Sequence, residues 1–345
     1  MTSAPAALPR TVREVQLVAV PEGLPAPEHF AVVETPLPEA GPGHVLVRNR
    51  YTLVFPGLRT LIGGEVEGVP LPPVHGGDTL FGPAVGEVVA APDDSPLRPG
   101  DTVTHLRGWR EYARVAVAEC GPLRGELPDP VAYLAQGSSA YGALTRLAQV
   151  REGDTVFVTG AAGAVGTLAG QIARLLGAGR VIGSTSSPAK AERLTAELGY
   201  DAVVLRGTDR GVAAQLAEAA PDGIDVLLDT VGGEQLTAAV DAARPGARFA
   251  LVGALSGQLS AGRAGGSSPV EIDSYRIVVK GISLRGYSGA DHPDVHAEWL
   301  ERFGGWLRSG DIRFPYSTIA GIDRAPSALP ELMAGRHFGA VVVEL

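Results

Sequence analysis

Three glycines spaced three residues apart, Gly160, Gly163 and Gly166, form the pattern in this sequence that points most directly to chemistry. With 46 glycines in 345 residues, a G-x-x-G-x-x-G string is expected about once by chance, so its setting must decide. The string follows the apolar run 156–158 and precedes an alanine- and leucine-rich stretch, 167–176, with helical spacing. A strand–turn–helix unit of this kind directs the helix N-terminal amides at a pyrophosphate, and its small residues let the backbone approach closely.

The turn therefore predicts a dinucleotide site, and the alternative is a glycine turn that serves only strand–helix packing. The residues expected to contact the cofactor there are Ala162, Gly163, Ala164, Val165 and Gly166.

The stretch after the second predicted strand bears on which dinucleotide binds. An acidic residue about 20 positions beyond the glycine turn would hold the ribose hydroxyls of NAD and repel a 2′-phosphate. This chain has no acid there and instead has hydroxyl side chains followed by a cation. The candidate phosphate-binding residues are Ser184, Thr185, Ser186 and Lys190, with Arg206 after the next strand. The pattern favours NADPH over NADH, and the alternative for Lys190 is a solvated lysine in the first turn of a helix.

A catalytic zinc ion is not indicated by the sequence. Such a site needs about three protein ligands of the cysteine, histidine or glutamate type, with one position open. The chain has a single cysteine, Cys120, and its histidines show no ligand spacing. These histidines are His29, His44, His75, His105, His292, His296 and His337. We expect no metal, and therefore no zinc-dependent alcohol oxidation.

Length and charge limit the classes of function. A chain of 345 residues predicts two domains, and 45% hydrophobic residues are enough for two cores. A net charge of −9 argues against nucleic-acid binding, which needs a basic face. No apolar run approaches the about 20 residues of a membrane span, and the N-terminus shows no signal-peptide pattern. We therefore expect a cytoplasmic protein, and its single cysteine excludes an intramolecular disulfide. The expected partner is a small-molecule substrate.

The pattern of elements changes near residue 126. Residues 12–117 alternate short β-type runs with glycine and proline turns, which predicts an irregular all-β unit. From about residue 130, apolar strands alternate with helical stretches, which predicts a parallel sheet covered by helices. Near the C-terminus we expect helices at 296–308 and 325–334 and a strand at 339–343. Residues 282–286 are expected to form an edge strand able to pair with a second copy, hence a homodimer.

Several motifs, taken in their order and spacing, resemble those of a known family, and the likeness covers most of the chain. The motifs are Val85-Gly86-Glu87-Val88-Val89, Pro99-Gly100-Asp101-Thr102-Val103, Gly108-Trp109-Arg110-Glu111-Tyr112, Ala140-Tyr141-Gly142-Ala143-Leu144, Ala161 to Gly166, Asp229-Thr230-Val231-Gly232-Gly233, Leu251-Val252-Gly253-Ala254, Val279-Lys280-Gly281-Ile282, Arg285-Gly286-Tyr287, and Gly335 with Gly339. They resemble the zinc-independent medium-chain dehydrogenases/reductases, closest to the branch of alkenal/one oxo-prostaglandin reductases and plant double-bond reductases.

The resemblance implies an α/β fold of two domains. A GroES-like, β-rich catalytic domain (residues 1–125) would be followed by a Rossmann cofactor domain (126–312), and residues 313–345 would return to the first domain. It also implies hydride transfer from the nicotinamide C4 atom of NADPH to an electron-poor carbon, most often the β-carbon of an α,β-unsaturated carbonyl. By position, Lys190 would contact the 2′-phosphate. The residues that would border the nicotinamide and its ribose are Thr230, Val252, Gly253, Ala254, Ser256, Tyr287 and His337.

Three departures from the family pattern fall on the substrate side of this implied site. A tyrosine usually found shortly after the strand that ends near Val252 is Gln258 here. A pocket tyrosine of the N-terminal domain is replaced by Gly57, and a late asparagine by His337. We therefore expect an altered and more open substrate pocket.

Proton delivery is the remaining question. Hydride addition to an enone leaves an enolate, which needs a proton donor within about 3 Å, or water. The candidate catalytic residues are Tyr51, Gln258 and Tyr287, with Ser256 as a further donor. The alternative for each tyrosine is an amphipathic core residue bonded to backbone.

The sequence thus predicts an NADPH-dependent reductase of carbon–carbon double bonds in α,β-unsaturated carbonyls. One alternative is a quinone oxidoreductase or a biosynthetic carbonyl reductase of the same fold. The other is a protein that binds NADPH without redox turnover, or that catalyses a non-redox cyclisation in its modified pocket.

Overall fold

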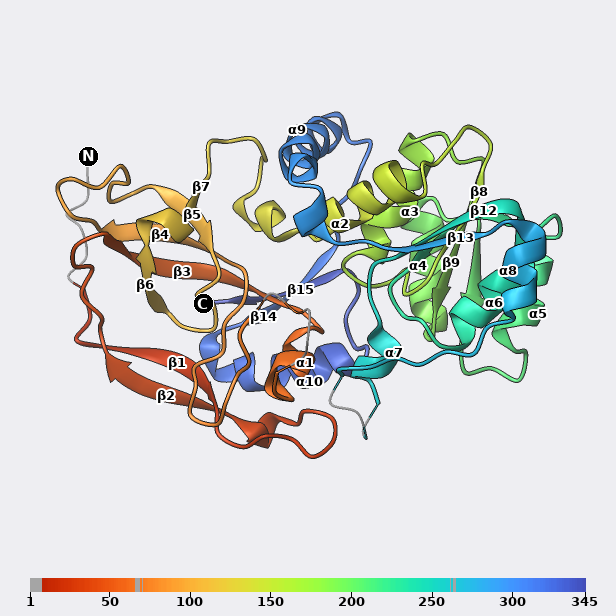
Figure 1. The fold of residues 1–345 in the computed structure, drawn as a ribbon. Coiled ribbons are helices and arrows are strands. Elements are labelled where there is room, and N and C mark those ends of the chain that lie inside the picture. Colours follow the sequence, from red (N-terminus) through yellow and green to blue (C-terminus); the bar gives the residue numbers. More distant parts are fainter. Residues whose placement is uncertain (1–7, 66–68, 70, 261, 263–264) are drawn as a thin grey trace. The chain divides into compact units, whose positions relative to one another are not determined.

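The computed structural model describes residues 8–65, 69, 71–260, 262 and 265–345, which divide into two compact units (Figure 1). Unit 1 takes the chain up to Gly125, together with Thr318–Ala334 and Val342–Leu345. Unit 2 comprises Glu126–Ser317 and Gly335–Val341. Residues 313–317 and 335–341 therefore belong to unit 2, whereas the family resemblance implied that all of 313–345 returns to the first domain.

Unit 1 is built from antiparallel strands. Strands β1 (Thr11–Leu17) and β2 (Phe30–Pro36) form a two-stranded sheet. A second sheet has the order β14-β15-β3-β4-β5-β7, and β6 pairs with β3; the first two residues of β14 and of β15 belong to unit 2. Its strands are β3 (His44–Val54), β4 (Ala84–Ala90), β5 (Thr102–His105), β6 (Tyr112–Ala116), β7 (Gly121–Pro122), β14 (Tyr316–Ala320) and β15 (Ala340–Glu344). Alternate valines of this sheet, such as Val45, Val47 and Val103, form a buried cluster, as expected when one face of each strand packs inward.

Unit 2 contains a six-stranded sheet with the order β10-β9-β8-β11-β12-β13, and every neighbouring pair is parallel. The strands are β8 (Thr155–Val158), β9 (Arg180–Thr185), β10 (Ala202–Leu205), β11 (Ile224–Asp229), β12 (Ala243–Leu251) and β13 (Ser283–Gly286). The chain starts at β8, builds outward to β10, and then crosses back to place β11 beside β8. In sheets of this doubly wound type, ligands bind at the carboxyl ends of the strands where the order reverses, here between β8 and β11.

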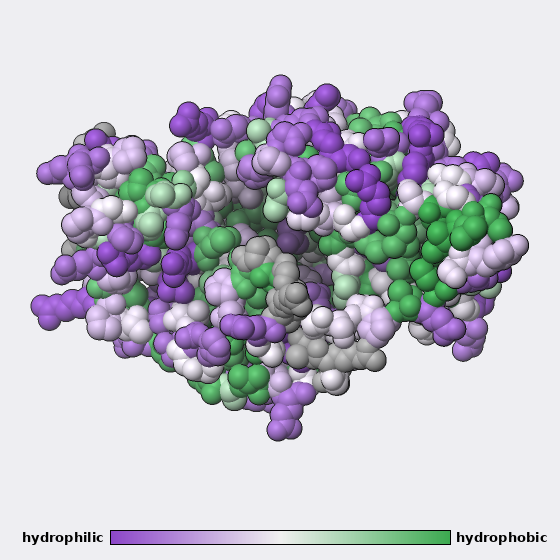
Figure 2. Space-filling view, in the orientation of Figure 1, coloured by the Kyte–Doolittle hydropathy of each residue, from purple (hydrophilic) through white to green (hydrophobic). Residues whose placement is uncertain are grey.

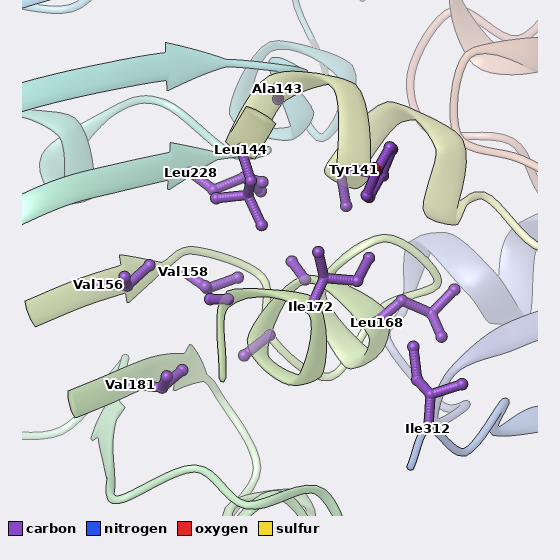
Figure 3. Close-up of a cluster of buried hydrophobic side chains, with 14 of the residues drawn as sticks. Tyr141, Ala143, Leu144, Val156, Val158, Leu168, Ile172, Val181, Leu228 and Ile312 are labelled. Carbon is purple, nitrogen blue, oxygen red and sulfur yellow. The ribbon is translucent and has the colours of Figure 1, made fainter. Parts of the chain in front are cut away.

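Apolar side chains cover both faces of the parallel sheet, which is why its strands have no polar side. Figure 3 shows one face, where Val156, Val158 and Leu228 of the sheet lie beside Leu144 and Ile172 of the covering helices. On the other face Phe157, Leu227 and Phe249 pack against side chains of α5 and α6. This alternation of Val156, Phe157 and Val158 fixes β8 in the middle of the layer, so the glycine turn that follows starts from a rigid position.

The helices of unit 2 are α2 (Gly137–Gly142), a π-helical turn (Ala143–Leu147), α3 (Gly166–Leu175), α4 (Pro188–Leu198), α5 (Val212–Ala219), α6 (Glu234–Ala242), α7 (Leu255–Gln258), α8 (Ser274–Lys280) and α9 (Asp294–Ser309). Of these, α3, α4, α5 and α6 follow β8, β9, β10 and β11 in turn, whereas α2 and the π-helical turn precede β8. Unit 1 contains the short helices α1 (Leu58–Ile62) and α10 (Ala328–Met333). None of the helices in the described part of the chain combines the length and apolar character that a membrane span requires.

Most of the expected elements are confirmed, including the strand–turn–helix unit at the glycines and the edge position of β13. One expected helix is different. Residues 325–334 do not form a single helix, because a 3₁₀ segment (Ile322–Ser327) precedes the six-residue α10. Pro330 lacks the amide hydrogen that a continuous helix would donate to the carbonyl of Pro326.

Candidate active site

The carboxyl ends of β8, β9, β11 and β12 carry most of the predicted cofactor residues of unit 2. β8 leads into the glycine turn, β9 into residues 185–187, β11 into residues 230–233 and β12 into residues 252–258. Because β8 lies between β9 and β11, the fold brings segments that are up to about 100 residues apart to one edge of the sheet.

The three glycines of the turn meet different steric demands. Gly160 has a φ of +61°, and a β-carbon there would lie 2.7 Å from Thr230 Oγ1. A β-carbon on Gly166 would lie 2.4 Å from the carbonyl oxygen of Gly160 and 2.5 Å from Ala161 Cα, both of them backbone atoms. Gly163 is exposed, and a β-carbon on it would meet only the Gly160 oxygen, at 3.3 Å. The conformation of the turn thus requires glycine at 160 and 166, whereas the absence of a side chain at Gly163 leaves the exposed surface of the turn accessible to a ligand.

The exposed rim of the turn offers hydrogen-bond donors. Gly163 donates its amide to the Gly160 carbonyl at 3.0 Å, and Thr167 donates to the Gly163 carbonyl at 2.9 Å. The amides of Ala164, Val165 and Gly166 precede the first closed turn of α3, so helix geometry supplies them with no acceptor. Free amides and the positive end of the α3 dipole together make this rim suited to an anion such as a pyrophosphate.

A buried carboxylate holds the ends of β8 and β11 together. Asp229 is 1% exposed and accepts hydrogen bonds from the Thr159 hydroxyl at 2.6 Å and from the amides of Val231 and Gly232 at 2.9 Å. Thr159 Oγ1 in turn accepts from the Thr230 amide at 2.8 Å, and the Thr230 hydroxyl donates to the Thr159 carbonyl at 2.9 Å. This network places Thr230 against the glycine turn.

Ser184 lies inside the protein. It is fully buried, and its hydroxyl accepts from the Gly160 amide at 3.1 Å and donates to Gln235 Oε1. Its side chain therefore supports the turn from behind and has no surface left for a phosphate. Thr185 is 6% exposed and accepts from the Ser187 amide at 3.4 Å, so its hydroxyl is also directed at backbone. Of the predicted hydroxyl residues, only Ser186 is exposed.

Arg206 follows β10, next to the end of β9. Its amide donates to the Thr185 carbonyl at 2.9 Å, which fixes the backbone beside Ser186. The side chain is half-buried, its Nε is inaccessible to solvent, and no hydrogen-bond or ion-pair partner for its guanidinium lies in the described part of the chain. A cation without a counter-charge, next to an exposed hydroxyl, is suited to binding a phosphate.

Lys190, in the first turn of α4, is neither solvated nor free. Its ammonium donates to the carbonyl oxygen of Gly335 at 2.6 Å and to that of His337. Both acceptors belong to the segment 335–341 of unit 2. Partial burial lowers the pKa of the lysine from its ordinary value. The structure thus gives Lys190 a contact that neither sequence-based interpretation included.

The loop after β12 lies against the end of β11. The amides of Val252 and Gly253 donate to the Asp229 carbonyl at 2.7 and 3.2 Å, and the Ser256 amide donates to the Val231 carbonyl at 2.9 Å. The hydroxyl of Ser256 shares a 2.7 Å hydrogen bond with that of Ser268. Gly253 and Ala254 are exposed, and Gln258 ends the short α7. The loop therefore extends the same edge of the sheet as the glycine turn.

The predicted catalytic tyrosines lie in different units. Tyr287 follows β13 in unit 2, where its ring stacks on His292 with centroids 5.5 Å apart. Its hydroxyl fills the space above Gly142, since a β-carbon on that glycine would lie 2.0 Å away. Burial raises the pKa of the Tyr287 phenol, which keeps it protonated. Tyr51 is in β3 of unit 1 and lines a cavity of about 560 Å³ together with Tyr112 and the C-terminal Leu345.

The residues do not fit a zinc ion. Within the described ranges, no three side chains of histidine, cysteine, aspartate or glutamate gather as metal ligands. The thiol of Cys120 donates to the Ala116 carbonyl at 3.5 Å, and burial raises its pKa to about 11, so it is not a thiolate at neutral pH.

Sequence reasoning missed three supporting residues, Thr159, Asp229 and Gln235. None touches the rim directly, but each holds a rim segment in place. The sequence signal for them is Asp229, an acid at the end of a buried strand, where burying an unpaired charge costs too much free energy.

Comparison with known proteins places the chain in a family. Residues 164–303 match the family model described as zinc-binding dehydrogenase, and residues 13–123 match that described as the N-terminal domain of oxidoreductase. A putative NADP-dependent oxidoreductase of Bacillus subtilis is 31% identical over 96% of this chain and 97% of its own length. The NADPH-dependent curcumin reductase of Escherichia coli is 30% identical, with 95% of each chain covered.

Other similar proteins agree with these. The NADP-dependent 2-alkenal reductase of Nicotiana tabacum is 28% identical over 90% of each chain. The structure of CurA from Vibrio vulnificus in complex with NADPH has a TM-score of 0.86 and 29% sequence identity, covering 96% of this chain and 98% of that one. The family and fold expected from the sequence motifs are confirmed: the chain belongs to the medium-chain dehydrogenase/reductase family, in the branch that holds these NADP-dependent reductases.

Proposed function

We propose that this protein reduces the carbon–carbon double bond of α,β-unsaturated carbonyl compounds with NADPH. The observation that carries the proposal is the carboxyl edge of the parallel sheet, where an open glycine turn follows β8 and the guanidinium of Arg206, unpaired among the described residues, follows β10. The names of the similar proteins, which include a 2-alkenal reductase and a curcumin reductase, support the choice of substrate class.

The cofactor would be held by backbone at one end and by cations at the other. The amides of Ala164, Val165 and Gly166 would bind the pyrophosphate, and Ala162 and Gly163 would pack against it. Arg206, Ser186 and Lys190 would bind the 2′-phosphate. Ser184 and Thr185 would act through the backbone that they hold. The residues that would border the nicotinamide and its ribose are Thr230, Val252, Gly253, Ala254, Ser256 and His337.

NADPH, when bound, supplies a hydride to the electron-poor carbon. The protein would supply the proton at the neighbouring carbon and a hydrogen bond to the carbonyl oxygen. The amide of Gln258 can donate a hydrogen bond but cannot give up a proton, so we assign it to the carbonyl. Of the two phenols, that of Tyr287 packs on Gly142, whereas Tyr51 lines a cavity. Because the Tyr287 hydroxyl is occupied by packing on Gly142, we assign proton delivery to Tyr51 and a packing role to Tyr287.

The domain roles follow the same proposal. We assign catalysis to residues 1–125, cofactor binding to 126–312 and completion of the first domain to the returning chain, apart from the segments 313–317 and 335–341 that pack in unit 2.

The test is turnover by the purified protein. We expect oxidation of NADPH, followed by its absorbance, with a 2-alkenal, an oxo-prostaglandin or curcumin as acceptor. Mass and NMR analysis of the product separates double-bond reduction from quinone or carbonyl reduction. Tyr51→Phe is expected to lower kcat by about 10²-fold or more, the usual size of a general-acid contribution, and Tyr287→Phe to leave it within a few-fold. If no acceptor leads to oxidation of NADPH, the proposal is refuted.

We also propose that the protein is a homodimer that pairs through β13. This strand is at the edge of its sheet, and α8 directly before it exposes three large side chains. Tyr275, Val278 and Val279 are 72%, 75% and 58% exposed. Figure 2 shows a hydrophobic area on the side of the molecule where Figure 1 places α8. Sedimentation should give a dimer for the wild type and a monomer for Val278→Asp, and a monomeric wild type would contradict this pairing.

Finally, we propose that the protein works in the cytoplasm. A reducing compartment suits a chain with one half-buried cysteine and no possible intramolecular disulfide. Cell fractionation with a compartment marker tests this, and enrichment outside the cytoplasm would refute it.

A further inference from the structure

The segment 335–341 is hydrogen-bonded to the predicted cofactor site at two points. At one end, the carbonyls of Gly335 and His337 accept from the Lys190 ammonium. At the other, the Gly339 amide donates to the Ala162 carbonyl at 2.9 Å, and Gly339 forms an isolated parallel bridge with Gly163. One segment thus touches both the glycine turn and the lysine that is expected to read the 2′-phosphate.

Further contacts fix the middle of the segment. Phe338 is 6% exposed, and the guanidinium carbon of Arg193 on α4 lies 3.9 Å from its ring centroid. The Phe338 carbonyl accepts from the Ser317 hydroxyl at 3.1 Å. Gly339 has a φ of +80°, and a β-carbon on it would lie 2.0 Å from the Pro315 carbonyl oxygen. The backbone at Gly339 is therefore restricted to a narrow range of conformations that only glycine adopts readily.

The charge balance at Lys190 is incomplete. An ammonium has three N–H donors, and two of them go to the carbonyls of Gly335 and His337. These acceptors are neutral dipoles, and no carboxylate of the described residues forms an ion pair with Lys190. A phosphate dianion at the third donor would supply the missing charge without displacing either carbonyl. It would also hold the ammonium charged and in place.

We propose that Lys190 is a positioning residue that couples the 2′-phosphate of the cofactor to the order of residues 335–341, so that NADPH fixes this segment more strongly than NADH. The inference rests on the proposed cofactor. By thermodynamic reciprocity, a segment that is docked on Lys190 raises the affinity for NADPH by the same factor by which NADPH stabilises the docked segment. The lysine would then both read the phosphate and hold the chain around His337 against the glycine turn.

Hydrogen–deuterium exchange of the peptide 334–341 tests the coupling, because the Gly339 amide is protected only while the segment is docked. Exchange is measured in the full-length protein with saturating NADPH, saturating NADH or neither, with saturation checked by nucleotide fluorescence. For the wild type we expect exchange with NADPH to be slower than with NADH by about five-fold or more, the lower end of typical couplings. In Lys190→Met the two nucleotides should give equal exchange.

Two further variants serve as controls. Lys280→Met removes the only other lysine of the chain, whose ammonium donates to the Asp241 carbonyl at 2.8 Å, and should keep the wild-type difference. Lys190→Arg keeps a cation with several donors and should restore part of the difference, so a misfolded Lys190→Met would not decide the matter alone. Equal exchange with both nucleotides in the wild type, or faster exchange with NADPH, would overturn the coupling.

The assay needs binding but no turnover, which separates it from the proposed function. If NADPH protects the segment more than NADH while no acceptor is reduced, the reductase proposal fails and the coupling stands. Turnover without a difference in protection refutes the coupling only. If NADPH does not bind, both fail.

Discussion

Substitution of Gly163 by alanine should separate cofactor binding from folding. Its φ is not in the left-handed region, and the added carbon would meet only the Gly160 oxygen at 3.3 Å, a contact that small shifts relieve. We therefore expect a stability change of about 1 kcal/mol or less, which corresponds to a melting temperature within about 2–4 °C of the wild type.

Binding should respond quite differently. A pyrophosphate oxygen accepts from backbone amides at about 2.9 Å, whereas a methyl carbon needs about 3.5 Å or more. The new carbon on the exposed rim would push the phosphate outward by about 0.5–1 Å and weaken at least one hydrogen bond to a charged group, worth about 1.5–3 kcal/mol. The Kd for NADPH should then rise by about 10- to 100-fold.

Fluorescence titration with NADPH and thermal unfolding, done on the same preparation, measure the two effects. Gly166→Ala is the matched comparison, because its carbon would overlap backbone at 2.4 Å and should cost about 1–3 kcal/mol of stability. If Gly163→Ala folds normally and binds NADPH within two-fold of the wild type, the turn is not the pyrophosphate site and the placement of the cofactor is wrong.

Three other predictions concern buried groups. Arg59 is 1% exposed, burial lowers its pKa, and its Nε and Nη1 have no hydrogen-bond partner among the described residues. In urea unfolding, Arg59→Met should therefore leave the stability unchanged or raise it by about 1–4 kcal/mol. A loss above about 1 kcal/mol would show that the guanidinium has a stabilising partner. Burial, with the cations of Arg110 and Arg107, lowers the pKa of His105 to about 4. Between pH 6.5 and 4 the unfolded histidine takes up a proton and the folded one does not, so the free energy of unfolding should fall by up to about 3 kcal/mol over this range. His105→Asn should flatten this pH dependence. An equal slope in the variant would show that His105 does not cause it. With its thiol pKa raised to about 11, Cys120 should react with iodoacetamide at pH 8 about 100-fold more slowly than a free cysteine, and a fast reaction would contradict its burial.

The fold was predictable where local pattern determines the element. The run 156–158, the glycines and the helical spacing after them all favour one strand–turn–helix unit, and the structure has β8, the turn and α3 there. The helix expected at 325–334 is shorter than its apolar spacing indicates, because Pro330 removes a main-chain hydrogen bond that a continuous helix needs.

The side chains at the site were harder to predict for a definite reason. In a parallel sheet that is covered on both faces, the alternation of inward and outward residues disappears, so the sequence 184–186 gives no sign that Ser184 is buried and Ser186 exposed. The partner of Lys190 is 145 or more residues away and depends on how the returning chain docks. No local spacing contains that information.

The residues at the carboxyl edge of the sheet fall into two groups, buried residues that shape the glycine turn and exposed residues that are available to the cofactor. Asp229, Thr159 and Ser184 have their polar atoms fully engaged inside the protein, and they set the shape of the turn before any ligand arrives. The side chains of Arg206 and Ser186 form no hydrogen bond or ion pair with the described residues, so the turn does not rely on their polar atoms. Preorganised backbone thus serves any dinucleotide, because every dinucleotide has the same pyrophosphate, while discrimination by the 2′-phosphate is left to a few rim side chains.

Lys190 belongs to both groups, since two of its ammonium hydrogens are donated to backbone carbonyls and the third is left for a ligand. For that reason a change at Lys190 should alter cofactor choice and chain order together, whereas a change at Arg206 should alter cofactor choice alone.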